Sequence, residues 1–233
     1  MKPVTIIRHI ACEGPGTLAN SLEKYKIPMR LIALDAGDGI PETLHDSCGL
    51  VIMGGPMSVN DDDAWIAQET RLVQHAIDSN LPVLGHCLGG QFIAKALGAT
   101  INKAPAKEIG WLPVSASNQQ GPAWLDQFKI PQQVFHWHGE TFDLPKHATR
   151  LLSSASCVNQ AFSYKDNVLA FQCHIEMTTN MIDEWSRLYA DEISVPTDTI
   201  QSKSDMMQST AQHIDNLNQL ARKVYADWIS HLR

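Results

Sequence analysis

Residues 81–98 read Leu-Pro-Val-Leu-Gly-His-Cys-Leu-Gly-Gly-Gln-Phe-Ile-Ala-Lys-Ala-Leu-Gly, an apolar run that passes through a G-x-C-x-G pattern into a helix-like segment. A side chain on such a sharp strand-to-helix turn is pushed out of the edge of a sheet. The flanking Gly85 and Gly89 lack the Cβ atoms that would collide at this turn. A helix N-terminus and a neighbouring imidazolium favour the reactive thiolate of a cysteine. The segment therefore predicts that Cys87 is a nucleophile.

The rest of the first half alternates short apolar runs with helix-like segments, a pattern typical of a parallel sheet covered on both faces. A helix is expected from Asp61 to about Ser79, because negative charge stabilises a helix start. The expected strands are Val4–Ile10, Met29–Leu34, Gly49–Met53 and Leu81–Gly85.

The second half has strand-like runs without helices of equal length between them, which indicates a more antiparallel region. These runs are Glu108–Val114, Gln133–His138 and Val168–Gln172, and helices are expected at Asn180–Ala190 and Asp205–Leu232. The fold class predicted is α/β, with a doubly wound, mostly parallel, flavodoxin-like sheet, helices on both faces and a smaller antiparallel extension. We expect one domain over residues 1–233, in which 200–233 is a C-terminal amphipathic helical extension.

The chain has 233 residues, 18 Lys and Arg against 25 Asp and Glu, and a formal net charge of -7. It has no basic footprint for a nucleic-acid backbone or an anionic membrane, so a small molecule or a protein is the expected partner. Its five cysteines are widely spaced and include no C-x-x-C pair. Without a disulfide framework, signal peptide or membrane span, we expect a soluble, cytoplasmic protein.

Two further segments complete a site around Cys87. His174 and Glu176 follow an apolar run and point to the same side of an extended chain, so Glu176 can orient the imidazole that serves the thiol. Gly54-Gly55-Pro56 follows a parallel strand and opens at the same sheet edge as the turn at Cys87. Backbone N–H groups of this loop and of Leu88 are the expected donors to an oxyanion.

These residues resemble the class I glutamine amidotransferase family over roughly residues 1–195. That family has a Gly-Gly-Pro loop, a G-x-C-x-G-x-Q elbow and a closing Q-F-H-P-E segment, and this chain reads Gly54-Gly55-Pro56, Gly85 to Gln91, and Gln172-Cys-His-Ile-Glu176 in the same order. The segments Glu108-Ile-Gly-Trp111 and His136-Trp-His-Gly-Glu-Thr-Phe-Asp143 resemble its stand-alone, GMP-synthase-like branch.

The resemblance implies that Cys87, His174 and Glu176 form a catalytic triad, that Gly55 and Leu88 form the oxyanion hole, and that Gly54, Gln91 and His138 contact the substrate. It further implies hydrolysis of the side-chain amide of glutamine through a γ-glutamyl thioester, with no cofactor. Ammonia would pass to an acceptor site on a separate synthetase polypeptide. Cys173 and Ile175 replace the Phe and Pro of the family motif, so the fixed φ angle of proline is lost there.

Other interpretations compete with this one. A γ-glutamyl peptide hydrolase uses the same triad, and a non-catalytic regulatory subunit can keep the scaffold. An α/β-hydrolase places its acid before its histidine, and only Asp126 stands in a suitable place. His136 and His138 have the spacing of a zinc pair, but no third and fourth ligands follow at a helpful spacing, so we expect no metal.

Overall fold

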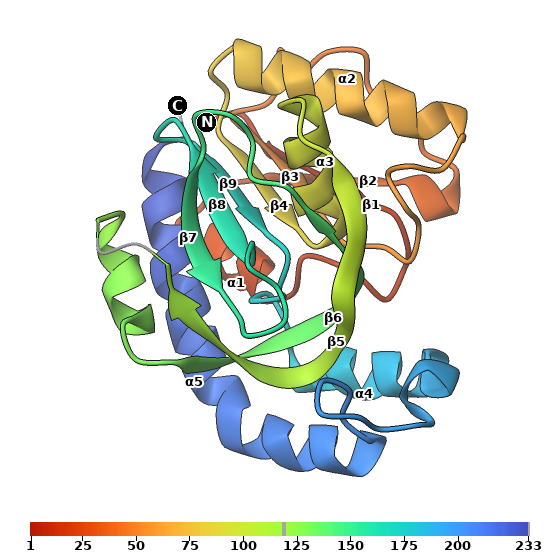
Figure 1. The fold of residues 1–233 in the computed structure, drawn as a ribbon. Coiled ribbons are helices and arrows are strands. Elements are labelled where there is room, and N and C mark those ends of the chain that lie inside the picture. Colours follow the sequence, from red (N-terminus) through yellow and green to blue (C-terminus); the bar gives the residue numbers. More distant parts are fainter. Residues whose placement is uncertain (118–119, 233) are drawn as a thin grey trace.

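Within residues 1–117 and 120–232, which the computed structural model describes, nine strands form one mixed sheet (Figure 1). Their order across the sheet is β2-β1-β3-β4-β9-β8-β7-β5-β6. The strands are β1 (Val4–Arg8), β2 (Met29–Ala33), β3 (Gly49–Ile52), β4 (Val83–His86), β5 (Ile101–Ala116), β6 (Gln132–Phe142), β7 (Thr149–Ser153), β8 (Ala161–Tyr164) and β9 (Val168–Phe171).

The five adjacent strands β2, β1, β3, β4 and β9 run parallel to one another. Their arrangement matches the 2-1-3-4-5 order of doubly wound sheets, in which ligands bind at the carboxyl ends of the strands. Strands β3, β4 and β9 are buried along their whole length, as expected for a parallel sheet covered on both faces. Because β4 and β9 are neighbours, the residues that directly follow them meet at one edge of the sheet.

Helices cover both faces of this parallel part (Figure 1). Successive residues of a strand point to opposite faces, so Ile6 packs in one apolar cluster and Ile7 in the other. Helices α2 (Ala64–Asp78) and α3 (Leu88–Ala96) cover the Ile7 face, and α1 (Gly16–Lys24), α4 (Thr179–Leu188) and α5 (Lys203–Ser230) contribute to the cluster of the Ile6 face. Among the described residues, no helix combines the length and apolar character that crossing a membrane requires.

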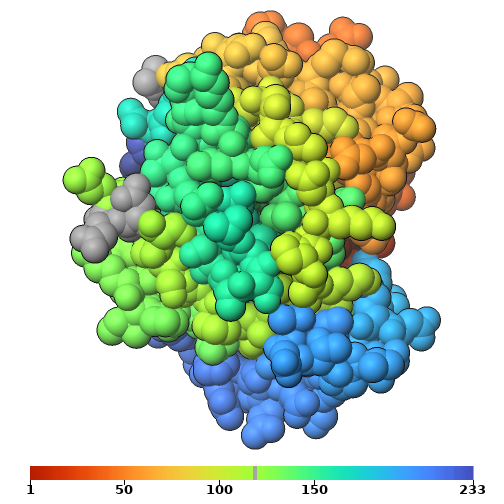
Figure 2. All heavy atoms as spheres, viewed as in Figure 1, coloured from red at the N-terminus to blue at the C-terminus, as the bar shows by residue number. Residues whose placement is uncertain are grey.

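The antiparallel part extends the sheet beyond β9. Strands β8 and β7 continue it, and the long β5 and β6 pair with each other, with an irregularity between Lys103 and Glu108. Ile200, which precedes α5, forms a bridge with Ile109 of β5. Figure 2 shows the blue segment around residue 200 against the yellow-green surface of this part. The described part of the chain also contains three short 3₁₀ helices: η1 (Leu34–Ala36), η2 (Ala123–Phe128) and η3 (Ala190–Ile193).

The predicted α/β class, with its parallel core and antiparallel extension, is confirmed, but some details were wrong. The sequence pattern assigned residues 168–172 to the antiparallel region, whereas β9 is parallel to β4 on one side and antiparallel to β8 on the other. Strands β7 and β8 and helix α1 were not predicted. Helix α2 begins at Ala64 rather than at Asp61. The predicted C-terminal helix matches α5, and residue 233 of the predicted extension lies outside the described residues.

Candidate active site

Cys87 stands on the turn between β4 and α3, as its sequence context predicts. Its backbone has φ 49° and ψ -107°, a strained conformation for a residue with a side chain. A Cβ atom on Gly85 would lie 2.4 Å from the backbone of Gly89, and one on Gly89 would lie 2.1 Å from the Ile52 carbonyl oxygen. The turn is therefore compatible only with glycine at both positions. The Cys87 N–H donates to the Phe171 carbonyl at 2.8 Å, which fixes this residue to the neighbouring strand β9.

His174 and Glu176 lie on the segment that leaves β9. The Nδ1 atom of His174 is 2.6 Å from Oε1 of Glu176, and both side chains are buried. Burial lowers the pKa of an imidazole, but the Glu176 carboxylate and the Cys87 sulfur outweigh it and hold the pKa of His174 well above its ordinary value. Burial raises the pKa of a carboxyl, yet His86 and His174 lower the pKa of Glu176 to about 2. Both shifts favour the charged form of the pair, an imidazolium beside a carboxylate.

The imidazole of His174 is available to Cys87 on its second nitrogen. Its Nε2 atom has no hydrogen-bond partner of normal geometry, although the Cys87 sulfur is near enough to raise the pKa of the ring. The indole of Trp185 packs edge-on against the ring, with 4.9 Å between centroids. The thiol itself donates to the Trp137 carbonyl at 3.7 Å. The structure thus brings together the three predicted triad residues.

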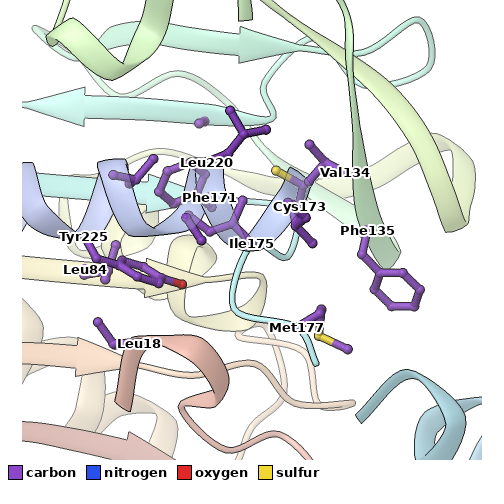
Figure 3. Packing of buried hydrophobic residues seen from close by; sticks show 14 of the residues in the cluster. Leu18, Leu84, Val134, Phe135, Phe171, Cys173, Ile175, Met177, Leu220 and Tyr225 are labelled. Atoms are coloured by element: carbon purple, nitrogen blue, oxygen red, sulfur yellow. The ribbon is translucent and has the colours of Figure 1, made fainter. Parts of the chain in front are cut away.

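Backbone hydrogen bonds hold the segment that carries the base and its acid. The His174 N–H donates to the Phe135 carbonyl at 2.8 Å, and the Thr17 N–H at the start of α1 donates to the Glu176 carbonyl at 2.9 Å. Cys173 and Ile175, which replace Phe and Pro of the family motif, are fully buried and pack in the apolar cluster shown in Figure 3. Packing and backbone contacts therefore fix this segment without the proline.

A cavity of about 250 Å³ opens over the sulfur. It is lined by Cys87, Gly55, Leu88, Gln91 and His138, so these predicted residues share one site. Gly54 is not among the lining residues; it packs between Glu13 and His174, where a Cβ atom would meet Oε2 of Glu13 at 2.1 Å. A larger cavity of about 510 Å³, lined by Trp124 and Trp228, contains no triad residue.

Sequence reasoning missed several buried polar groups that surround the triad. His86 precedes the nucleophile, and its Nδ1 atom lies 3.3 Å from Oε2 of Glu176 while Tyr225 of α5 is 3.4 Å from its Nε2 atom. Burial lowers the pKa of His86. The carboxyl of Glu13 lines the cavity, and burial, helped by Glu176 and opposed by His174, raises the pKa of Glu13 to about 7. His86 could have been noticed as a histidine inside an otherwise apolar strand, whereas no feature of the neighbouring sequence distinguished Glu13.

The structure also corrects the reasoning about His136 and His138. A third group that can bind a metal does lie beside them, because Glu108 of β5 is opposite His138 of β6 in the register of the two strands. Sequence spacing did not reveal it, since the strands are joined by a long connection. Asp126, the alternative acid, lies on η2 and pairs with Lys129 rather than with a histidine.

Comparison with known proteins agrees with this geometry. Residues 16–184 match the family described as glutamine amidotransferase class-I. The chain is 30% identical over 187 residues to the glutamine amidotransferase-like protein YfeJ of Salmonella typhimurium, covering 77% of this chain and 78% of that protein. It is 31% identical over 133 residues to one of the subunits of the glutamine-hydrolysing GMP synthase of Thermoplasma acidophilum, covering 55% of this chain and 63% of that protein.

A solved structure shows the same fold along the full chain. The crystal structure of a glutamine amidotransferase from Methylobacillus flagellatus superposes with a TM-score of 0.94 and is 37% identical, covering 100% of this chain and 96% of that one. With the family match over residues 16–184, this extends the likeness from three short motifs to the whole architecture. The chain belongs to the class I glutamine amidotransferase family.

Proposed function

We propose that this protein hydrolyses the side-chain amide of glutamine with Cys87 as nucleophile. The observation that carries the proposal is the buried array of Cys87, His174 and Glu176 at the adjoining ends of β4 and β9. An imidazolium beside a cysteine favours the thiolate, which is the attacking form. The charged His174 and Glu176 pair supplies that imidazolium.

In the first half of the reaction, the Cys87 thiolate attacks the carboxamide carbon. The C–N bond breaks as the His174 imidazolium gives its proton to the nitrogen, and ammonia leaves. In the second half, the neutral imidazole takes a proton from a water whose oxygen attacks the thioester carbon. The C–S bond breaks, glutamate leaves, and the thiolate and imidazolium are restored. Glu176 holds the ring through Nδ1 in both halves.

We assign the oxyanion hole to the backbone N–H groups of Gly55 and Leu88. Both residues line the cavity beside Cys87, and Leu88 is the first residue of α3, where N–H groups are free to donate. Of the predicted substrate contacts, we retain Gln91, which lines the cavity. His138 also lines the cavity, but its Nδ1 atom is bonded to the Glu140 carbonyl at 3.0 Å and its Nε2 atom faces Glu108 at 3.1 Å, so we do not assign it to the substrate.

The ammonia acceptor is proposed to be a separate synthetase, because the chain resembles a protein whose name makes it one of the subunits of GMP synthase. The cavity of about 250 Å³ suits a substrate of amino-acid size, since pockets for drug-sized ligands span about 300–1,000 Å³. The five cysteines are free thiols, which fits the reducing, cytoplasmic location that we propose.

The test compares ammonia release from glutamine with amine release from γ-glutamyl peptides. We expect the wild type to release ammonia and Cys87→Ser to lose at least about 10³-fold in kcat. A diazoketone analogue of glutamine should add one mass equivalent to the wild type and to Cys48→Ser, but none to Cys87→Ser. Activity on γ-glutamyl peptides alone would make the protein a γ-glutamyl hydrolase instead. Folded protein with neither activity nor labelling would make it a regulatory subunit.

A further inference from the structure

Three buried side chains on neighbouring strands form a cluster that the proposed reaction does not use. They are Glu108 of β5 and His136 and His138 of β6, and one candidate ligand atom from each lies within 4.8 Å of the others. Oε2 of Glu108 is 3.1 Å from Nε2 of His138 and 3.9 Å from Nδ1 of His136. Ligand atoms about 2.0–2.2 Å from one zinc ion lie within about 4 Å of each other, so small ring rotations close this set around an ion.

The cluster also contains unsatisfied nitrogens. Neither ring nitrogen of His136 has a hydrogen-bond partner of normal geometry, and its side chain is fully buried. The same is true of Nε2 of His138, which lies near Glu108 but is not aligned with it as in a hydrogen bond. Buried polar atoms are almost always satisfied, and orphaned ones indicate an ion or water that the protein binds.

The tautomer of His138 fits metal binding. Its Nδ1 atom is 3.0 Å from the Glu140 carbonyl oxygen, which can only accept, so Nδ1 carries the hydrogen. Nε2 is then the ring nitrogen that faces the Glu108 carboxylate, at 3.1 Å from its Oε2 atom, and is the one placed to bind an ion. A histidine that binds a metal usually donates the N–H of one ring nitrogen to a backbone carbonyl or carboxylate and gives the lone pair of the other nitrogen to the metal.

Glu108 is held as metal-binding carboxylates are. Its Oε1 atom accepts a hydrogen bond from Ser154 at 2.7 Å, and its Oε2 atom accepts one from Gln160 at 2.6 Å. Such outer partners orient a carboxylate and tune its affinity for a metal. Two imidazole nitrogens and a carboxylate oxygen suit Zn²⁺ better than the hard cations Mg²⁺ and Ca²⁺, which prefer oxygen ligands.

We propose that Glu108, His136 and His138 bind a divalent transition-metal ion of the Zn²⁺ class. The ion joins β5 to β6 at the wall of the catalytic cavity, because His138 and the neighbouring Trp137 also line that cavity. It is separate from the Cys87, His174 and Glu176 chemistry, and its presence does not depend on which amide the protein hydrolyses.

The experiment uses the full chain, expressed without a polyhistidine tag and carrying Cys87→Ser so that the catalytic sulfur cannot bind the probe. Elemental analysis should find about one zinc per chain. After chelation, titration with Co²⁺ should give the visible absorption of a four-coordinate site, and Zn²⁺ should displace it and raise Tm. His136→Gln and Glu108→Gln should abolish the Co²⁺ spectrum, whereas the matched control His75→Gln, at an exposed histidine, should retain it.

Ser154→Ala tests the site through a partial loss of metal affinity, even if His136→Gln and Glu108→Gln do not fold. Because it removes an outer partner of Glu108 and leaves the three proposed ligands in place, we expect folded protein with about 10- to 100-fold weaker Co²⁺ binding. Two outcomes would overturn the proposal. One is folded parent protein that takes up neither Co²⁺ nor Zn²⁺, which would make Glu108 and His138 a metal-free ion pair. The other is uptake that His136→Gln, Glu108→Gln and Ser154→Ala all leave unchanged.

Discussion

The ring of His174 is fixed by three different kinds of contact. Its Nδ1 atom meets Glu176 at 2.6 Å, its backbone N–H donates to Phe135, and Trp185 packs against its face. The position of the ring therefore depends on packing as well as on charge. Its protonation depends mainly on Glu176, because burial alone lowers the pKa of an imidazole.

Glu176→Gln separates the effect of Glu176 on the position of the His174 ring from its effect on the protonation of that ring. The amide has nearly the same shape but no charge, so the pKa of His174 should fall and the imidazolium that stabilises the thiolate should be lost. We expect kcat for glutamine hydrolysis to drop about 10²- to 10⁴-fold with little change in KM. Steady-state kinetics would check this, with His75→Gln as a folded control at an exposed site. A kcat within about threefold of the wild type would show that Glu176 does not act on the imidazole.

Glu13→Gln tests the buried carboxyl of the cavity. Because its pKa in the folded protein is about 7, above the unfolded value, the folded state holds a proton that the unfolded state releases as pH rises. This component of stability is present at low pH and is lost between about pH 4.5 and 7. The variant has no carboxyl to ionise at this position. Its free energy of unfolding relative to the wild type should therefore rise by about 1–3 kcal/mol as the pH increases from about 4.5 to about 8.

Urea unfolding at about pH 4.5, 6 and 8 measures this difference directly. The exposed carboxylate of Glu42 offers the matched control, and Glu42→Gln should change the free energy of unfolding equally at all three values. A constant difference between Glu13→Gln and the wild type across the range would mean that folding does not raise the pKa of Glu13.

At the residue scale, the proximity of His174 and Glu176 near Cys87 could be predicted because the proposed chemistry restricts residue types and places them beside recognisable strands. Cys87 lies in a glycine pattern, and His174 and Glu176 follow an apolar run. Glu13, His86 and Glu108 could not be assigned roles in the same way. Their partners come from other elements: the triad segment in the first two cases and β6 in the third.

Among the elements, the short helix α1 contacts the segment that carries Glu176. Its first residue, Gly16, has φ 49°, and a Cβ atom there would lie 2.0 Å from the Glu176 carbonyl oxygen. The start of α1 is thus packed directly against the backbone that carries the triad acid.

Gly16→Ala should therefore shift Glu176 and reduce kcat. We expect a loss of at least about tenfold, because displacing a catalytic group by about 1 Å is costly. The control is Gly14→Ala, two residues earlier, where nothing lies within 4 Å of a Cβ atom. Kinetics with thermal melts on both variants would separate a local shift from unfolding. Equal activity of the two would refute the coupling of α1 to Glu176.

Helix α2 stabilises the glycine loop through a buried ion pair. Its Glu69 accepts from Nε2 of His9 at 3.0 Å, and Nδ1 of the same ring lies 3.1 Å from the Gly54 carbonyl. Both side chains are fully buried.

Glu69→Ala should leave His9 buried without its charge partner, so we expect a loss of about 3–5 kcal/mol in the free energy of unfolding. Lys203→Ala, which breaks a half-exposed pair with Asp183, should cost under about 1 kcal/mol. Urea unfolding at neutral pH measures both. Equal costs would mean that the His9 pair contributes no more than a surface contact.

Predicting the elements worked where the apolar pattern was clear. Strands β1, β3 and β4 are mainly apolar and buried, and α5 repeats its apolar residues every three or four positions. Strands β7 and β8 mix polar with apolar side chains, so their pattern was not recognised. The direction of β9 depends on which strand pairs beside it, which local sequence does not encode.

For the whole molecule, one sheet connects both apolar clusters, since β1, β3, β4 and β9 contribute residues to each. We expect this sheet to unfold as one unit, in keeping with a single domain. Far-ultraviolet circular dichroism and tryptophan fluorescence should give coincident urea transitions. Val224→Ala in α5 and Val73→Ala in α2, on opposite faces, should shift both signals together. Separate transitions would divide the chain into two folding units.

The adjacency of β4 and β9 affects when reactivity arises during biosynthesis. The cysteine strand leaves the ribosome well before the strand that brings the base, because β9 starts at Val168. Until β9 inserts beside β4, the sulfur lacks His174 and Glu176, the two groups that the proposed reaction requires. A nascent or partly folded chain should therefore lack the proposed activity until the centre of its sheet is complete.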